Sequence, residues 1–265
     1  MSKVENFTMQ MPQLGRSRTV WVYLPDNYQQ QGQPLPVIYM HDGQNIFYDH
    51  LTAYGTAWHV DKSMDEIYRQ MGFSAIIVGV ECCDEVRLTE YSPWKTNLPM
   101  RDVPKINRGG QGAEYAEFFA TTLKAEIDGR YNTDPSRQAT AVIGSSMGGL
   151  ISLYIGLKYQ HLYQTMGLFS TFTPFNFAAV NNFLRKTPQT LHQHALVYCG
   201  GKEGLSVPDK AMERASIKLY YQLSKRNVAT ELLFHSDMVH NESAWDVYFK
   251  KFAVDFLNRY HANNA

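Results

Sequence analysis

A glycine–serine–glycine turn between a strand-like run and a helix-like run constrains the fold of this chain more than any other segment. Residues 138–143 are β-prone, Gly-Ser-Ser-Met-Gly follows at 144–148, and an apolar helical pattern comes next. In a GxSxG turn of this kind the chain reverses so sharply that the central serine is exposed in a strained conformation, and side chains at the two glycine positions would collide. The context therefore predicts a nucleophile elbow, with Ser146 as the nucleophile.

Strand-like and helix-like runs alternate along most of the chain. Two β-prone runs at 4–11 and 18–24 flank Leu14-Gly15-Arg16, which predicts an antiparallel pair at one edge of a sheet. The runs at 37–40 and 74–80 are short and apolar without alternation, as in strands that are buried on both faces. Further strands are predicted at 138–143, 165–169, 195–199 and 229–234. Helices are predicted at 60–71, 113–128, directly after Ser146, and near 178–186, 209–225 and 243–260.

This alternation predicts one α/β domain over residues 1–265, with a mostly parallel central sheet, helices on both faces and an antiparallel N-terminal edge. The segment 81–112 interrupts the pattern, because it is long for a connection inside a compact domain. Its aromatic residues Tyr91 and Trp94 favour a structured flap over the site. The alternative is that the two rings anchor this segment to the core.

Charge and cysteine content narrow the partners and the compartment. The chain has 25 basic and 25 acidic residues, which argues against a nucleic-acid or anionic membrane partner. Three cysteines, two of them adjacent, do not form the spaced framework of a secreted disulfide scaffold. No run resembles the apolar core of a signal peptide or reaches the ~18 apolar residues of a membrane span. We expect a soluble, cytoplasmic protein, and the sequence leaves its oligomeric state open, a homo-oligomer included.

The order of polar residues along the chain predicts the partners of the serine. A serine hydroxyl needs a neutral imidazole to take its proton and an acid to orient that imidazole. Where the nucleophile lies in such an elbow, the acid and then the histidine follow it, each in a loop after a strand. Glu203 follows the strand at 195–199, and His240 follows the last strand. Asp209 is the rival acid, and Asp237 is a third candidate.

The reaction also needs backbone amides that bind the oxyanion of the tetrahedral intermediate. One donor is predicted to be the amide of Met147, directly after the nucleophile. The other is predicted to be the amide of Gln44, in a loop where Gly43 allows close approach of the backbone. His41 has no HxH, HExxH or CxxC partner, so the sequence predicts no metal and no cofactor.

Four segments together are similar to the “Putative esterase” family of α/β-hydrolases, which includes feruloyl, acetyl-xylan and siderophore esterases, esterase D and the mycolyltransferases. The resemblance implies that Ser146 is the nucleophile, that His240 is the base and that the acid lies in the loop containing Glu203. It also implies an oxyanion hole formed by the Gln44 and Met147 amides. The segments that carry it are 39–47, 90–94, 144–149 and 240–245.

The function expected from these residues and this resemblance is hydrolysis of a carboxylic ester through an acyl-enzyme. The expected substrates are soluble small-molecule esters with short acyl or hydroxycinnamoyl groups, sugar-linked esters among them. Two alternatives stay open: an acyltransferase with a sugar or other alcohol as acceptor, and a non-catalytic hydrolase-like binding protein. Candidate substrate contacts are His41, Asp42, Glu90, Tyr91 and Trp94.

Overall fold

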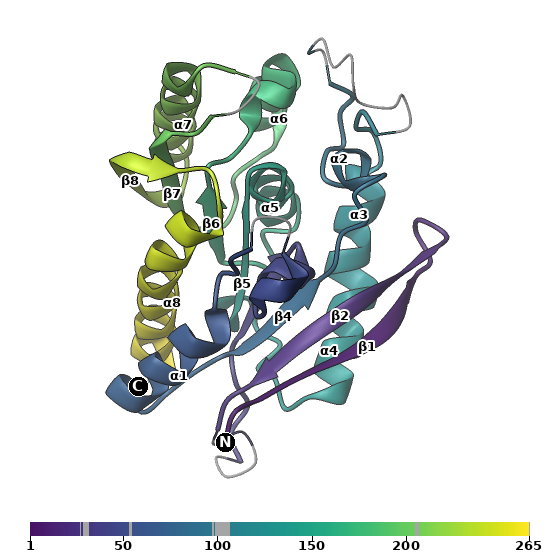
Figure 1. Cartoon of the computed structure of the whole chain (residues 1–265), viewed down its shortest axis with the longest axis vertical. Helices are drawn as coiled ribbons and strands as arrows, with labels where there is room; N and C mark the ends of the chain where they lie inside the picture. The colour runs from purple at the N-terminus through teal and green to yellow at the C-terminus, as the bar shows by residue number, and fades with distance from the viewer. Residues whose placement is uncertain are drawn as a thin grey trace.

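An eight-stranded sheet runs through the computed structural model, which describes residues 1–26, 28, 32–52, 55–96, 98, 107–204 and 207–264 (Figure 1). The strand order is β1-β2-β4-β3-β5-β6-β7-β8. β1 pairs antiparallel with β2, and β2 with β4, whereas all pairs from β4 to β8 are parallel. The predicted α/β fold with an antiparallel N-terminal edge is therefore confirmed. The strands are β1 Lys3–Met11, β2 Arg16–Leu24, β3 Val37–His41, β4 Ile76–Val80, β5 Thr140–Ser145, β6 Thr165–Phe169, β7 Gln193–Lys202 and β8 Val228–Val239.

Helices cover both faces of the sheet, which explains why the central strands are apolar without alternation. Every residue of β3, β4, β5 and β6 is buried. One face packs against α1 (Val60–Met71) and α8 (Glu242–Asn264), through a core that includes Trp58 and Phe249. The other face packs against α3 Gly112–Phe118, α4 Lys124–Arg130, α5 Met147–Lys158, α6 Phe177–Lys186 and α7 Asp209–Ser224. Short turns of helix complete the chain at η1 Gly43–Asn45, η2 Asp49–Leu51, α2 Arg87–Glu90, η4 Arg137–Ala139 and η5 Thr173–Asn176.

Two elements differ from the sequence prediction. The helix expected at 113–128 runs without a gap from Gly112 to Arg130 but contains a π-helical turn at Phe119–Leu123, which separates α3 from α4. The strand expected at 229–234 continues to Val239, because β7 also extends and pairs with it past a register shift. A Cβ on Gly201 would lie 2.2 Å from the Ser236 carbonyl oxygen, so glycine is needed for this close approach. The extension brings the residue after β8, His240, beside the end of β7.

Backbone hydrogen bonds join the two described parts of the segment 81–112. The amides of Gly110 and Gly112 both donate to the Ser92 carbonyl, at 2.8 and 3.1 Å, and Thr96 N donates to the Arg108 carbonyl at 2.8 Å. A Cβ on Gly112 would lie 2.4 Å from the Ser92 carbonyl carbon, which explains glycine there. Residues 97 and 99–106 lie outside the described residues, so the middle of the predicted flap lies outside them as well.

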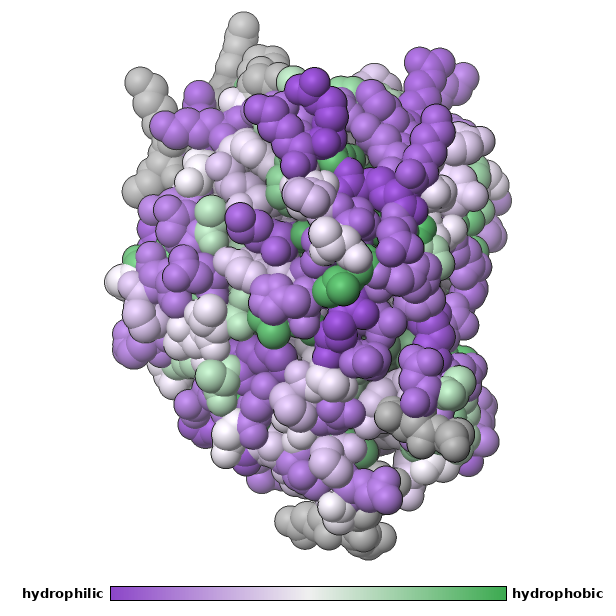
Figure 2. Space-filling view, turned by 180° about the vertical axis from the view of Figure 1, so that it is seen from behind, coloured by the Kyte–Doolittle hydropathy of each residue, from purple (hydrophilic) through white to green (hydrophobic). Residues whose placement is uncertain are grey.

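The surface of the molecule is largely polar in the view from behind. Figure 2 shows hydrophilic side chains over most of that face, with small and separate hydrophobic patches. Within the described residues, none of the helices is both long enough and apolar enough to cross a membrane.

Candidate active site

Ser146 lies at the sharp turn between β5 and α5. Its backbone has φ 57° and ψ −119°, a conformation that costs a non-glycine residue free energy and is found mostly at functional sites. Backbone hydrogen bonds hold this turn: Ser146 N donates to Phe169 O at 2.8 Å, and Ser146 O accepts from Phe172 N at 3.0 Å and from Leu150 N at 3.1 Å. This is the strained geometry predicted for a nucleophile elbow.

Close packing excludes a side chain at Gly144 and leaves little room for one at Gly148. A Cβ on Gly144 would lie 2.6 Å from the carbonyl carbon of Gly148 and 2.9 Å from Cδ2 of His41. A Cβ on Gly148 would lie 3.3 Å from Oδ2 of Asp42. The absence of side chains at these positions lets the start of α5 lie directly against the end of β3.

Glu203 and His240 meet at the carboxyl ends of β7 and β8. The carboxylate of Glu203 accepts a hydrogen bond from His240 Nδ1, and the glutamate side chain is fully buried. Its Oε1 also accepts from Gly200 N at 2.7 Å and from Ser170 Oγ at 2.9 Å. The ring of Trp245 stands edge-on to the imidazole, with 5.0 Å between centroids. The imidazole is therefore oriented from two sides.

The two alternative acids have other partners. Asp209 begins α7, and its Oδ1 accepts from Gly204 N at 2.8 Å. Asp237 is exposed and forms an ion pair with Lys202 at 3.2 Å. Of the three candidate acids, Glu203 is the one bonded to His240. The catalytic roles of Ser146, His240 and Glu203 stay predictions at this point.

A cavity of about 350 Å³ opens at this edge of the sheet, as expected for the carboxyl ends of parallel strands. Ser146 and His240 both line it, so the serine and the histidine face a common space. The described residues that line it are Asp42, Gln44, Asn45, Leu51, Trp58, Cys82, Asp84, Arg87, Ser145, Ser146, His240, Glu242 and Trp245.

The loop predicted to supply an oxyanion amide is held rigidly beside β4. The Gln44 side chain brackets Cys82, accepting from its amide at 3.1 Å and donating to its sulfur at 3.0 Å. A Cβ on Gly43 would lie 2.7 Å from the Gly79 carbonyl oxygen, so only glycine fits there. Gln44 lines the cavity, and Met147, the first residue of α5, directly follows the serine. Their amide roles in catalysis stay predictions.

Asp42 lines the cavity as half of a two-point ion pair. Arg87 Nε and one terminal nitrogen donate to its two carboxylate oxygens, at 2.7 and 2.8 Å. Burial by itself would raise the pKa of Asp42, and the charge and hydrogen bonds of Arg87 outweigh it, so the pKa is lowered. The Asp42 amide also contacts the Tyr91 hydroxyl oxygen at 3.0 Å. Asp42 is thus ionised, and Arg87 largely neutralises it.

His41 lies behind the cavity and does not line it. Its Nδ1 is 3.1 Å from the Tyr115 hydroxyl, and its ring packs on Phe119 with 4.6 Å between centroids. Burial lowers the pKa of His41 to about 3, so the imidazole is neutral throughout the physiological range. The structure therefore corrects the predicted substrate contact: His41 packs beneath the elbow.

Acid should destabilise the protein through His41. Below pH 6.5 the unfolded chain binds a proton on this side chain, whereas the folded chain does not until about pH 3, so stability falls as pH falls through this range. From pH 7 to pH 5 wild type should lose about 2 kcal/mol more unfolding free energy than His41→Gln. Urea unfolding at both pH values measures this difference, and equal losses in the two proteins would contradict it.

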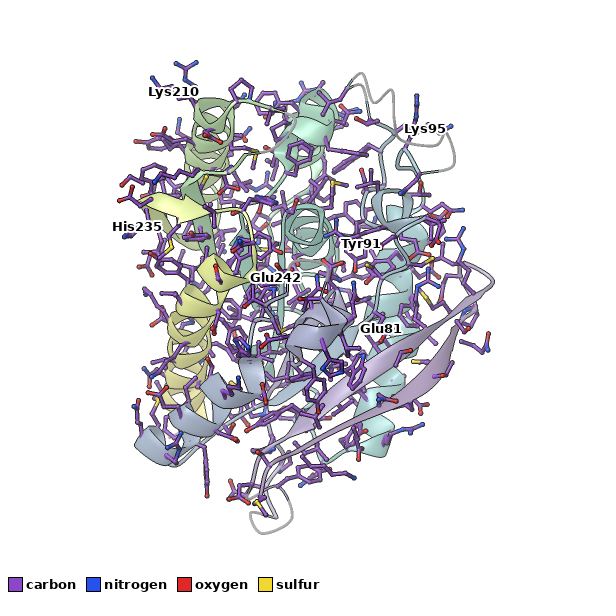
Figure 3. All side chains as sticks on the ribbon, in the orientation of Figure 1. Glu81, Tyr91, Lys95, Lys210, His235 and Glu242 are labelled. Carbon is purple, nitrogen blue, oxygen red and sulfur yellow. The ribbon has the colours of Figure 1, made fainter. Side chains whose placement is uncertain are left out.

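The three flap residues predicted to touch substrate are packing residues instead. Glu90 is fully buried and bonded to Arg16 and Arg18 of β2, at 2.6 and 2.7 Å. Tyr91, labelled in Figure 3, is also fully buried, and its ring packs at a tilt against the rings of His41 and Tyr115. The Trp94 ring packs against Tyr154 and Phe183. None of the three lines the described part of the cavity. The anchoring interpretation fits these positions.

The sequence prediction missed several residues that line the cavity, above all Glu242. It begins α8, where Figure 3 shows it toward the centre of the molecule. Its position two residues after His240 is the signal that could have indicated it. Trp58 and Trp245 add aromatic surface to the same cavity.

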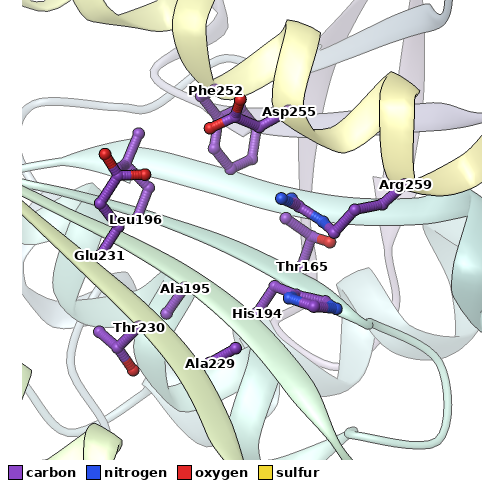
Figure 4. A pocket seen from close by; sticks show the side chains of 10 residues that line it. All are labelled: Thr165, His194, Ala195, Leu196, Ala229, Thr230, Glu231, Phe252, Asp255 and Arg259. Atoms are coloured by element: carbon purple, nitrogen blue, oxygen red, sulfur yellow. The ribbon is translucent and has the colours of Figure 1, made fainter.

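A second cavity, of about 240 Å³, lies at the amino ends of the parallel strands, opposite the cavity beside Ser146 (Figure 4). It is lined by the first residues of β6, β7 and β8 and by the C-terminal half of α8, including Thr165, His194 and Arg259. Burial lowers the pKa of His194 to about 4. Because ligands of α/β folds bind at the carboxyl ends of the strands, the cavity beside Ser146 is the candidate active site.

Comparison with known proteins shows which family this chain resembles. The family model described as “Putative esterase” matches residues 11–250. A protein of Bacillus subtilis (strain 168), “Uncharacterized protein YbbA”, is 28% identical over 155 residues, which cover 58% of this chain and 56% of that protein. This chain thus spans little more than half the length of that relative.

Solved structures share the fold over nearly the whole chain. An IroE-like serine hydrolase from Shewanella oneidensis has a TM-score of 0.79 at 15% identity, covering 97% of this chain and 81% of that one. A ferulic acid esterase has a TM-score of 0.72 at 18% identity, covering 97% and 99%. The enterobactin esterase FES from Shigella flexneri has a TM-score of 0.70 at 15% identity, covering 96% and 59%. Because the family match extends over most of its length, the chain belongs to the “Putative esterase” family.

Proposed function

We propose that this protein is a serine hydrolase that cleaves soluble carboxylic esters through an acyl-enzyme. The observation that carries the proposal is the arrangement of three side chains. Ser146, in a strained turn, shares a cavity with His240, and the Nδ1 of His240 is bonded to the buried carboxylate of Glu203. A nucleophile, a base and an orienting acid in this order are what acyl transfer requires.

In the proposed reaction, Ser146 Oγ attacks the ester carbonyl while His240 Nε2 takes its proton. Glu203 holds the other imidazole nitrogen protonated and stabilises the positive charge that forms on the ring. The amides of Gln44 and Met147 donate to the oxyanion. His240 then protonates the leaving alcohol, and a water molecule, activated by the same histidine, releases the acid from Ser146.

The cavity supports short acyl or hydroxycinnamoyl groups, on sugars or other alcohols, as the substrate class. Its volume of about 350 Å³ suits a small ester, and the rings of Trp58 and Trp245 offer flat apolar surface near Ser146. Two proteins of the same fold are a ferulic acid esterase and an enterobactin esterase solved with 2,3-di-hydroxy-N-benzoyl-serine. Both descriptions name an aromatic ring, in ferulic acid and in an N-linked benzoyl group, which agrees with a cavity lined by two indole rings.

Turnover of a panel of acetyl, butyryl and feruloyl esters, with product analysis, tests this function. We expect the free acid as the main product, with a burst of alcohol in the first turnover for esters whose acyl-enzyme is hydrolysed more slowly than it forms. A main product acylated on an added sugar or glycerol would make the protein an acyltransferase instead. Absence of both turnover and a covalent acyl adduct would contradict the proposal.

A further inference from the structure

Glu242 is a buried acid in the catalytic cavity that the proposed mechanism does not use. It is 2% exposed and lines the cavity together with Ser146 and His240. Its Oε1 accepts from Asn45 Nδ2 at 2.9 Å. Its Oε2 has no hydrogen-bond partner among the residues that the structure describes.

A buried carboxylate oxygen without a donor is costly. Leaving such an acceptor unpaired costs folding free energy, and the cost is larger when the group is charged. Burial raises the pKa of Glu242 to about 7, and the charge of Asp42 adds to this rise, while hydrogen bonds from the residue's own amide and from Asn45 lower the pKa. Such a cost at the edge of a ligand cavity is offset when a ligand supplies the missing donor.

We propose that Glu242 is a substrate-binding residue that accepts a hydrogen bond from a hydroxyl group of the ester. The inference rests on the proposed function and narrows its substrate class to esters that carry a hydroxyl on the acyl or the alcohol part. A hydroxyl group can donate to the carboxylate form of Glu242 and accept from its carboxyl form, so it can pair with this side chain on either side of the pKa of about 7.

The contact with Asn45 gives Glu242 a fixed position relative to the reacting atoms. Asn45 follows Gln44 in η1, the turn predicted to bind the oxyanion, and Glu242 follows His240 by two residues. A substrate hydroxyl bound to Glu242 would therefore have a fixed position relative to the oxyanion amides and to the base. A site built to bond a substrate hydroxyl discriminates strongly against the analogue that lacks it.

Paired substrates test this role. The pairs are nitrophenyl butyrate with its 2- and 3-hydroxy derivatives, and propyl butyrate with glyceryl butyrate, assayed at pH 8, where most Glu242 is ionised. Wild type should prefer at least one hydroxylated ester about tenfold in kcat/KM, mainly through KM. Glu242→Gln, which keeps an oxygen for Asn45, should reduce that preference to about threefold or less, with kcat/KM for the plain esters changed less than threefold. Glu242→Met, which also loses the bond to Asn45, should lose the preference and show in addition the general fall in kcat expected of Asn45→Ala.

Two further variants separate binding from support of the loop. Asp246 lies one turn further along α8, contacts His59 at 3.4 Å and does not line the cavity. The control variant Asp246→Asn should therefore keep the wild-type preference for the hydroxylated ester. Asn45→Ala removes the bond to η1 and should lower kcat on all esters alike. No preference in wild type, or an equal loss on plain and hydroxylated esters in Glu242→Gln, would overturn the proposal. If wild type cleaves none of the esters and carries no acyl group on Ser146, the proposed function itself fails.

Discussion

Replacing Ser146 with alanine should lower kcat on nitrophenyl acetate by about 10⁴-fold or more, because removal of a serine nucleophile has effects of this size in related chemistry. The substitution removes only the hydroxyl group. The backbone hydrogen bonds of Ser146 to Phe169, Leu150 and Phe172 do not involve this group. The fold should therefore persist, with an unchanged circular dichroism spectrum and a Tm within a few degrees of wild type.

Steady-state kinetics on purified Ser146→Ala measures this loss, and Ser145→Ala is the matched control. Ser145 is the neighbouring hydroxyl in the same cavity lining, at the end of β5 and not at the turn. Ser145→Ala should retain most of the activity. Activity of Ser146→Ala above about one hundredth of wild type, in a folded protein, would show that Ser146 is not the nucleophile.

The second large effect is expected at Glu203. Glu203→Gln should lower kcat about 10³- to 10⁴-fold, the range seen when the orienting acid of a triad becomes an amide. A glutamine can still accept from Gly200 N and Ser170 Oγ, as Glu203 does at 2.7 and 2.9 Å. Its amide nitrogen would then face His240 Nδ1 and favour the wrong tautomer of the imidazole.

Asp209→Asn is the matched comparison, because Asp209 is the rival acid in the same loop region. An asparagine oxygen can still accept from Gly204 N, so kcat should change by less than about threefold. Both variants are measured with one substrate under one condition. An equal loss in the two variants, or a larger loss in Asp209→Asn, would assign the acid role to Asp209.

Much of the fold could be predicted from sequence because its signals are local. Apolar runs without alternation gave the buried parallel strands, and the helical spacing of Val60, Met64 and Ile67 gave α1. The end of β8 could not be predicted in this way. Its last residues are mostly exposed and polar, and they extend the sheet only because Gly200 and Gly201 let them approach β7.

The site residues that could be predicted are those marked by local sequence motifs, and those that could not be predicted depend on partners far away in the sequence. The elbow at Ser146 and the loop positions of Glu203 and His240 follow from motifs and chain order, and the structure brings Glu203 and His240 into contact. Glu90 was misjudged because its partners, Arg16 and Arg18, lie more than 70 residues away. Nothing near it in the sequence indicates that it points into the molecule.

Glu242 was missed for a related reason. Its bonded partner Asn45 is 197 residues away, and a glutamate at the start of a helix usually serves only to favour the helix N-terminus. Only the folded chain shows that this carboxylate is buried and beside the serine.

Mass spectrometry of the protein after reaction with a fluorophosphonate tests the central claim most directly, because the reagent labels only a serine activated by a neighbouring base. We predict one adduct per chain, located on Ser146, with loss of ester turnover in proportion to labelling. Labelling should be at least 100-fold slower in His240→Ala. An adduct on any other residue, or an unlabelled protein that still cleaves esters, would contradict this account.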